Sequence, residues 1–244
     1  MGEARKRGNR AERIAAALAA IDLLPIANRK IYKYTQRKYA EKLISHGSTR
    51  VGTLEDFRRE EHGKGISDPL EGTSLASAHI LDQRIDGGTP NADALRSLGI
   101  DLGPNASVHI VDGHLFNNRR TSENLFVWCF STKKSRETMA QFQDADTCVE
   151  IFDTQNFFNL LAQAVATKLQ APLRTAGAGL VQYDDRIQTW DGQNPFDHPV
   201  FCKEKKYAPQ HEGRAVFAPT TAITTPFLII DSSDIYKYCR IVSV

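Results

Sequence analysis

The run Leu125-Phe126-Val127-Trp128-Cys129-Phe130-Ser131 decides the fold, because it is the most hydrophobic short stretch in the chain. A continuous apolar run of this length, rich in aromatic residues, is typical of a strand that is buried on both faces. We therefore predict a central strand here.

Strand patterns of β-branched and aromatic residues recur before and after this run. The predicted strands cover residues 31–35, 48–52, 108–111, 147–152, 179–183, 200–203, 214–217, 227–230 and 235–242. Residues 53–75 are predicted as a loop. Residues 76–106 are rich in Gly, Asp, Asn and Pro, and predict an irregular, exposed insertion with a weak helical pattern over 92–98.

Three segments have the composition and periodicity of helices. Residues 11–24 are rich in Ala and Leu and stop at a proline, residues 36–46 end at Gly47, and residues 154–170 end before Pro172. The first helix packs on the body of the domain or, alternatively, binds a partner such as an antitoxin or immunity protein. Helices lie mainly in the first two thirds and strands dominate the rest, which predicts an α+β fold with a mixed or antiparallel sheet.

The composition is that of a globular protein with a sizeable core. The chain has 244 residues, of which 41% are hydrophobic and 25% are charged, and its formal net charge is +2. These values exclude wholesale disorder and binding of polyanions by the whole surface, and they leave a local basic groove open. We expect a basic tail and helix over 1–29, followed by one domain over 30–244.

The four cysteines are scattered, which is typical of small buried residues in a reducing compartment. They are Cys129, Cys148, Cys202 and Cys239, without CxxC spacing, and the histidines are not paired as zinc ligands. The sequence shows no signal-peptide pattern and no apolar run long enough to span a membrane. We therefore expect a cytoplasmic protein with no metal site and no membrane partner.

The common nucleotide-binding and nucleophile motifs are missing from the sequence. It has neither GxGxxG after a strand nor GxxxxGK[ST], and it has no GxSxG elbow. Acid–base candidates must therefore come from Asp, Glu or His residues among the predicted strands.

Two clusters of candidate residues lie in the first third of the chain. Lys33 stands between Tyr32 and Tyr34 and points to the opposite face of its strand, by alternation. It is either a functional cation or a surface lysine on a half-buried strand. Asp68-Pro69-Leu70-Glu71-Gly72 places two carboxylates in a turn. They are candidates for binding a metal ion or a ribose, and the alternative is a solvated turn.

The third cluster is Glu212 and Arg214, at the start of an apolar strand. Two residues apart on a strand, they share one face. As a surface ion pair they would contribute little to stability. A carboxylate held beside an arginine, however, stays ionised, so it is able to accept hydrogen bonds from ribose hydroxyls or to stabilise an oxocarbenium ion.

Taken in chain order, these segments resemble the bacterial DUF2971 family, which has no settled activity. The resemblance spans roughly residues 31–218 and rests on five short sequence motifs: Ile31-Tyr32-Lys33-Tyr34-Thr35, Gly47-Ser48-Thr49-Arg50-Val51-Gly52, Asp68-Pro69-Leu70-Glu71, Cys129-Phe130-Ser131 and Glu212-x-Arg214. The layout is in turn similar to ADP-ribosyltransferases, which cleave NAD in a two-sheet α+β fold with flanking helices.

The resemblance implies a role for several residues. Glu212 would be the catalytic carboxylate, and Ser131 would support the nicotinamide side of NAD. Lys33 fills a position that is Arg or His in such transferases and, with Tyr34, would contact NAD. Two further residues, Arg50 and Arg214, would bind the NAD diphosphate or ribose. Four others would contact the acceptor: Lys205, Lys206, Tyr207 and His211.

Three functions are consistent with the sequence. The first is an NAD-consuming ADP-ribosyltransferase-like enzyme, a toxin or anti-phage effector that modifies nucleic acid or protein. The second is a non-catalytic domain that binds a nucleotide or a protein partner. The third is a hydrolase or nuclease that uses Asp68, Glu71 and a divalent ion.

Overall fold

The structure is a computed structural model of the chain. It describes residues 29–59, 68–80, 82–97, 99–111, 114–184, 187–189 and 198–244, so the helix predicted over 11–24 lies outside the described residues. The chain divides into two compact units. Unit 1 takes the described residues within 1–71, 124–181 and 207–244, and unit 2 those within 72–123 and 182–206.

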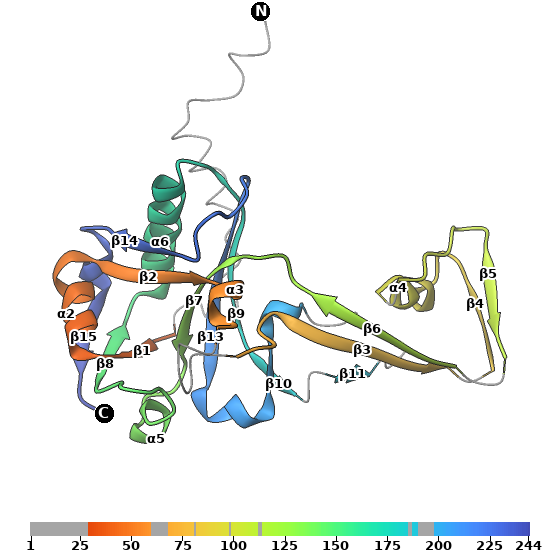
Figure 1. The fold of residues 1–244 in the computed structure, drawn as a ribbon, viewed down its shortest axis with the longest axis horizontal. Coiled ribbons are helices and arrows are strands. Elements are labelled where there is room, and N and C mark those ends of the chain that lie inside the picture. The colour runs from red at the N-terminus through yellow and green to blue at the C-terminus, as the bar shows by residue number, and fades with distance from the viewer. Residues whose placement is uncertain are drawn as a thin grey trace, which may run out of the picture. The chain divides into compact units, whose positions relative to one another are not determined.

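Unit 1 is built on one eight-stranded antiparallel sheet (Figure 1). Its strands are β1 (Ile31–Thr35), β2 (Ser48–Thr53), β7 (Phe126–Ser131), β8 (Thr147–Ile151), β9 (Leu173–Leu180), β13 (Glu212–Pro219), β14 (Phe227–Asp231) and β15 (Cys239–Val242). The predicted central strand is confirmed, because β7 pairs with three other strands. The α+β class with a mostly antiparallel sheet is likewise confirmed.

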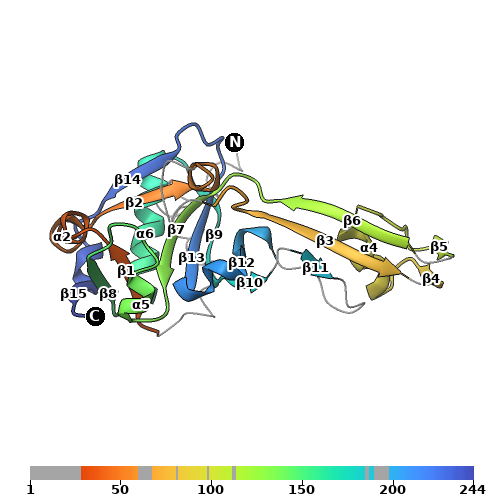
Figure 2. The same ribbon diagram turned by 60° about the horizontal axis from the view of Figure 1, so that its bottom comes forward.

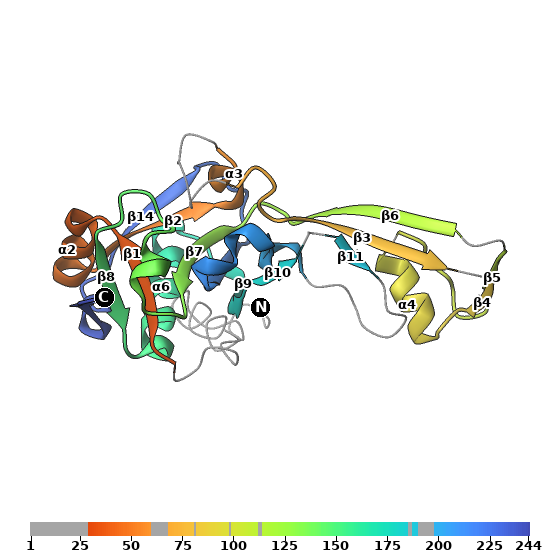
Figure 3. The ribbon, with the colours of Figure 1, turned by 90° about the horizontal axis from the view of Figure 1, so that it is seen from below.

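The sheet forks at β7. One edge of β7 pairs with β13 along its whole length, and β13 continues to β9. The other edge is shared: β2 pairs with its start, at Phe126 and Val127, and β1 pairs with its end, at Ser131. From there β2 continues to β14, while β1 continues to β8 and β15. β1 and β2 therefore diverge from a common strand (Figure 3).

Helix α6 (Thr154–Leu169) supplies the main hydrophobic partner of this sheet. Its Phe157 and Phe158 pack on the β7 aromatics, with ring centroids 5.1 Å apart for Trp128–Phe157 and 5.5 Å for Phe130–Phe158. Asp153 caps the helix, as its side chain accepts a hydrogen bond from the amide of Asn156.

Helix α2 (Arg37–His46) also packs on the sheet and ends as predicted. Gly47 adopts the left-handed conformation, with φ of 64°, which glycine reaches without steric cost. A Cβ at this position would lie 1.7 Å from the carbonyl oxygen of Ser232, so glycine is required for close approach as well as for conformation.

The described part of unit 2 contains smaller sheets, one α-helix and one short 3-10 helix (Figure 2). Its elements are β3 (Thr73–Ile80), β4 (Gln83–Asp86), α4 (Pro90–Ser97), β5 (Ser107–Ile110), β6 (His114–Thr121), β10 (Gln182–Asp184), β11 (Ile187–Thr189), η3 (Pro199–Phe201) and β12 (Cys202–Glu204). β3 pairs antiparallel with β6 and parallel with β11, β4 pairs with β5, and β10 pairs parallel with β12. A small core of Ile85, Ala92, Leu95 and Ile110 lies between α4, β4 and β5.

Three expectations from the sequence are wrong. The region 53–75 contains helix α3 (Leu54–Phe57) and the start of β3, and the region 76–106 contains strands as well as the expected helix. The sequence pattern did not predict these strands because they are rich in small and polar residues. Pairing with neighbouring strands, rather than an apolar pattern, stabilises them. The last predicted strand begins as a short helix, η5 (Ile235–Tyr238), before β15. The other short helices are α5 (Arg136–Met139) and η4 (Lys205–Gln210).

Within the described part of the chain, no helix has both the length and the hydropathy needed to cross a membrane.

We predict that Gly213→Ala destabilises the protein by about 1–3 kcal/mol through overpacking. A Cβ at this position would lie 2.3 Å from the Phe130 ring, which is itself fixed by α6. Urea unfolding measures the change. Gly103→Ala is the control, because a Cβ there meets no atom within 4 Å. Equal stability of the Gly213 variant and the wild type would contradict the packing described above.

Candidate functional site

Three neighbouring strands bring Glu212, Ser131 and Tyr32 into one row. Glu212 on β13 is the partner of Ser131 on β7, and Ser131 is the partner of Tyr32 on β1. Directly opposed residues of antiparallel strands point to the same face. The structure therefore brings together the two residues predicted to be catalytic, Glu212 and Ser131, which are 5% and 1% exposed.

Arg214 binds two carboxylates at this end of β13. Its Nε lies 2.7 Å from Oε1 of Glu212, and its Nη1 lies 2.6 Å from Oε1 of Glu71. The three side chains are at most 4% exposed, so this is a buried ion triad. The sequence correctly placed Glu212 and Arg214 on one face, but the surface-pair alternative is wrong.

Electrostatics keep Arg214 charged. Burial alone would lower the pKa of its guanidinium, but Glu212 and Glu71 outweigh burial and hold that pKa well above its usual range. Arg214 is therefore a fixed cation within the triad.

The turn that carries Glu71 is itself closely bonded. The amide of Glu71 donates to the carbonyl of Asp68, and the amide of Leu70 donates to the Asp68 side chain at 3.1 Å. The Nε of Arg58 donates to the Glu71 carbonyl at 2.8 Å. Asp68 and Glu71 are 1% and 3% exposed, so the solvated-turn alternative for this segment is wrong.

Lys33 occupies the fork where β1 leaves β7. Its Nζ donates to the carbonyl of Cys129 at 2.6 Å and lies 4.9 Å from the centre of the Trp128 ring. Along β7, Cys129 lies between Val127, which pairs with β2, and Ser131, which pairs with β1. Lys33 therefore satisfies a partly buried backbone acceptor at the fork.

Burial lowers the pKa of Lys33, because it penalises the ammonium. The negative charges of Cys129, as thiolate, and Glu212 act in the opposite direction, and the charge of Arg50 lowers this pKa further. Lys33 is thus within electrostatic range of both Glu212 and Arg50.

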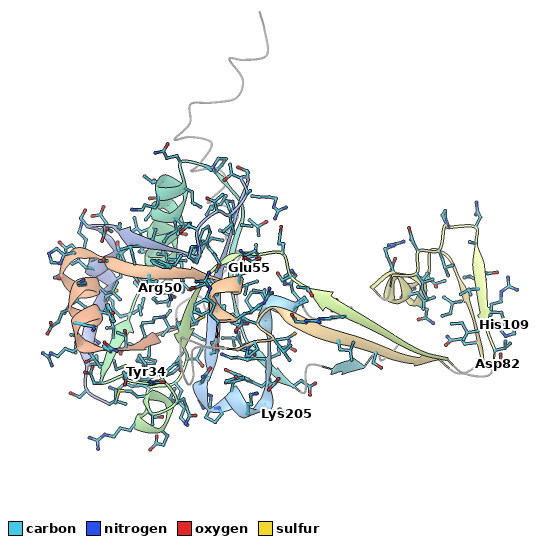
Figure 4. The ribbon with its side chains drawn as sticks, viewed as in Figure 1. Tyr34, Arg50, Glu55, Asp82, His109 and Lys205 are labelled. Carbon is cyan, nitrogen blue, oxygen red and sulfur yellow. The ribbon has the colours of Figure 1, made fainter. Side chains whose placement is uncertain are left out.

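Arg50 is held beside helix α3 (Figure 4). Its Nη2 lies 2.5 Å from Oδ2 of Asp56, and its guanidinium lies 4.5 Å from the centre of the Phe227 ring. Asp56 is 2% exposed, whereas the Arg50 side chain is 35% exposed. The predicted cation therefore has a fixed position and remains accessible to solvent.

The two predicted hydroxyl groups both contact the backbone. Ser131 Oγ donates to the carbonyl of Gln210 at 2.9 Å, which ties the end of β7 to the segment before Glu212. Tyr34 donates to the carbonyl of Lys133 at 2.7 Å and accepts from the amide of Ser135. Burial is the main cause that raises the pKa of Tyr34 to about 12, so it is a neutral hydrogen-bonding group.

The residues predicted to meet an acceptor are divided between the two units. Lys205 and Lys206 belong to unit 2, where Lys205 Nζ lies 3.2 Å from Asp184 and Lys206 pairs with Glu204. Tyr207 and His211 belong to unit 1. His211 directly precedes Glu212, has a φ of 46° and accepts a hydrogen bond from the amide of Thr132 through its carbonyl.

Sequence reasoning missed Asp56, which fixes Arg50. A local signal was available: Thr53 accepts a hydrogen bond from the Asp56 amide and so caps α3, and acidic residues favour the first turn of a helix. No local signal connects Glu71 to Arg214, because the two are far apart in the sequence.

Among the residues that the structure describes, no group of three or more His, Cys, Asp or Glu side chains is placed to hold a metal ion. The four cysteines form no disulfide bond, and Cys148, Cys202 and Cys239 are buried.

Comparison with known proteins adds no relative: no protein-family model, curated protein or solved structure matches the chain.

We predict that Lys33 makes stability depend on pH. Its pKa is lower in the folded protein than the ordinary value of about 10.4, so between these two values the unfolded chain binds more protons. The contribution of Lys33 to stability therefore rises with pH across that window, as the cost of the buried charge disappears.

The measurement is the free energy of unfolding of the wild type minus that of Lys33→Met, from pH 7 to 11. The difference cancels other groups that titrate in the same range, such as Cys148, whose pKa burial raises to about 11. A difference that stays flat or falls with pH would contradict the burial of a lysine with a lowered pKa.

We predict that Arg214→Met destabilises the protein by about 3–5 kcal/mol, because it leaves two buried carboxylates without their shared cation. Arg37→Met is the matched control. Arg37 also pairs through Nε with a glutamate Oε1, at 2.8 Å, but its side chain is 69% exposed. That change should cost less than about 1 kcal/mol. Thermal or urea unfolding measures both variants. A loss of stability in Arg214→Met no larger than that in Arg37→Met would argue against a buried triad.

Proposed function

We propose that this protein is an NAD-dependent ADP-ribosyltransferase-like enzyme in which Glu212 is the catalytic carboxylate. The observation that carries the proposal is the position of Glu212, which Arg214 holds at the end of a strand, in one row with Ser131. The charges of Arg50 and of Glu212 both lie close enough to Lys33 to affect its pKa. A fixed carboxylate near cations suits a ligand with ribose hydroxyls and a diphosphate.

The carboxylate has a defined task in this chemistry. Cleavage of the bond between ribose and nicotinamide passes through a cationic, oxocarbenium-like state. Glu212 would accept a hydrogen bond from the ribose 2′-hydroxyl, and its negative charge would stabilise the cation. Arg214 is then a positioning residue, since it fixes the carboxylate and does not touch the substrate.

The reaction balances without a further reagent. The bond between ribose C1′ and the nicotinamide nitrogen breaks, and nicotinamide leaves with the electron pair. A nucleophilic atom of the acceptor, or water, forms the new bond to C1′ and loses its proton, for which Glu212 is the nearby base. Arg50, whose side chain is 35% exposed, would pair with the diphosphate by charge-assisted hydrogen bonds.

The second candidate is a non-catalytic domain that binds a nucleotide or a protein partner. It is favoured by the burial of the triad, because three side chains that are at most 4% exposed act as a structural anchor between the Glu71 turn and β13. In both cases the biological setting proposed from the sequence is a bacterial toxin or anti-phage system.

The test is release of nicotinamide from NAD by the purified chain. Glu212→Gln should lower the rate at least about a hundredfold, the scale of a lost acid–base or electrostatic catalytic group. Glu41→Gln is the matched control, because Glu41 also accepts from an arginine Nε but lies exposed on α2. It should leave the rate unchanged.

Thermal shift by NAD separates the two candidates. Stabilisation by NAD without nicotinamide release, in the wild type and in Glu212→Gln alike, would support the binding domain. If the protein releases no nicotinamide and NAD does not raise its melting temperature, the proposed use of NAD is contradicted.

A further inference from the structure

A second charged cluster lies on the same sheet, at the strands farthest from β13 on the β1 branch. Glu150 on β8 is the partner of Tyr32 on β1 and of Arg240 on β15. Arg240 Nε lies 2.9 Å from Oε1 of Glu150, and Lys30 Nζ lies 3.8 Å from the same atom. One carboxylate thus holds two cations, and the local charge is net positive.

Aromatic rings border these cations. The Arg240 guanidinium lies 5.5 Å from the centre of the Phe152 ring, and Phe152 is 43% exposed. Tyr32 is partly exposed and shares the face of Glu150. The side chains of Lys30 and Arg240 are 56% and 57% exposed, whereas Glu150 is 6% exposed. We call Lys30, Tyr32, Glu150, Phe152 and Arg240 the β8 patch.

The β8 patch combines the two contacts that bind single-stranded nucleic acid. Exposed cations contact successive phosphates, and exposed aromatic rings stack on bases without reading their sequence. The carboxylate is buried beneath the cations, so it orients them and presents little negative charge to a ligand. The pKa of Tyr32 is raised, by burial and then by Glu150, so its hydroxyl stays neutral and does not repel phosphate.

Strand register connects the β8 patch to Glu212. The opposed residues run Glu212, Ser131, Tyr32, Glu150 and Arg240 across β13, β7, β1, β8 and β15, strands that lie in this order in the sheet. With about 4.8 Å between neighbouring strands, Glu150 lies about 14–15 Å from Glu212 along the sheet. The row points from the proposed catalytic carboxylate to the exposed cations.

We infer that the β8 patch binds single-stranded nucleic acid. The inference deepens the proposed function and rests on it in one respect: the bound strand would be the acceptor of ADP-ribose. The binding itself requires no catalysis and is tested separately.

The experiment is fluorescence anisotropy of the full chain with short fluorescein-labelled oligo-dT and oligo-U over a series of salt concentrations. Two phosphate contacts predict a slope of log K against log salt of about −1.4, and Arg240→Ala or Lys30→Ala should each reduce it to about −0.7. Phe152→Ala should weaken binding about fivefold or more at every salt concentration, because a stacking partner is lost.

Lys38→Ala and Tyr39→Ala are the matched controls. They remove an exposed cation and an exposed ring that are 4.9 Å apart on α2 and are not members of the β8 patch, and they should leave binding unchanged. Absence of oligonucleotide binding, or loss of affinity in the controls equal to that in the patch variants, would overturn the inference. So would preferential binding of phosphatidylserine vesicles with no effect of Phe152→Ala.

Glu212→Gln distinguishes this inference from the proposed function. Oligonucleotide binding by that variant and by the wild type, without nicotinamide release from either, would refute the enzyme and retain the patch. Nicotinamide release without oligonucleotide binding would retain the enzyme and refute the patch.

Discussion

The shared edge of β7 is the constraint on which the rest of unit 1 depends. One strand pairs with β13 on one side and divides its other side between β1 and β2. Where two strands diverge, backbone groups between them lose their ladder partners, and burial makes such a loss costly. The ammonium of Lys33 meets this need at the Cys129 carbonyl. The fork therefore explains why a lysine lies against the tryptophan of the main core.

The ion triad solves a second problem, the attachment of an irregular segment to a regular one. Glu71 ends a turn without a ladder of its own, and Arg214 lies within a strand that is buried along its whole length. Their direct bond, together with Glu212, fixes both at one point. A buried ion pair adds little net stability compared with apolar side chains, but it tolerates few alternative geometries. The triad therefore restricts where the Glu71 turn and the start of β13 can lie relative to each other.

Sequence patterns predicted the elements whose apolar residues face one core. β7, α2 and α6 were found because their periodicity and terminal residues reflect burial in unit 1. β3 and β6 were missed or misassigned, because their small and polar residues form a ribbon through cross-strand hydrogen bonds. In the site, the common face of Glu212 and Arg214 followed from strand alternation. Their burial and the bond to Glu71 did not, since these depend on contacts between distant segments.

The order of segments along the chain has a consequence for biosynthesis. Unit 1 is assembled from three separate stretches, and the chain passes into unit 2 twice before β13, β14 and β15 are made. While β2 and β7 leave the ribosome, the strands that cover their remaining edges do not yet exist. The sheet can close only late in translation, and its contacts are dominated by residues distant in sequence, a topology associated with slow folding. Nascent chains of this protein therefore hold unpaired apolar strands until β13 and β14 have been made, and such strands are prone to aggregate.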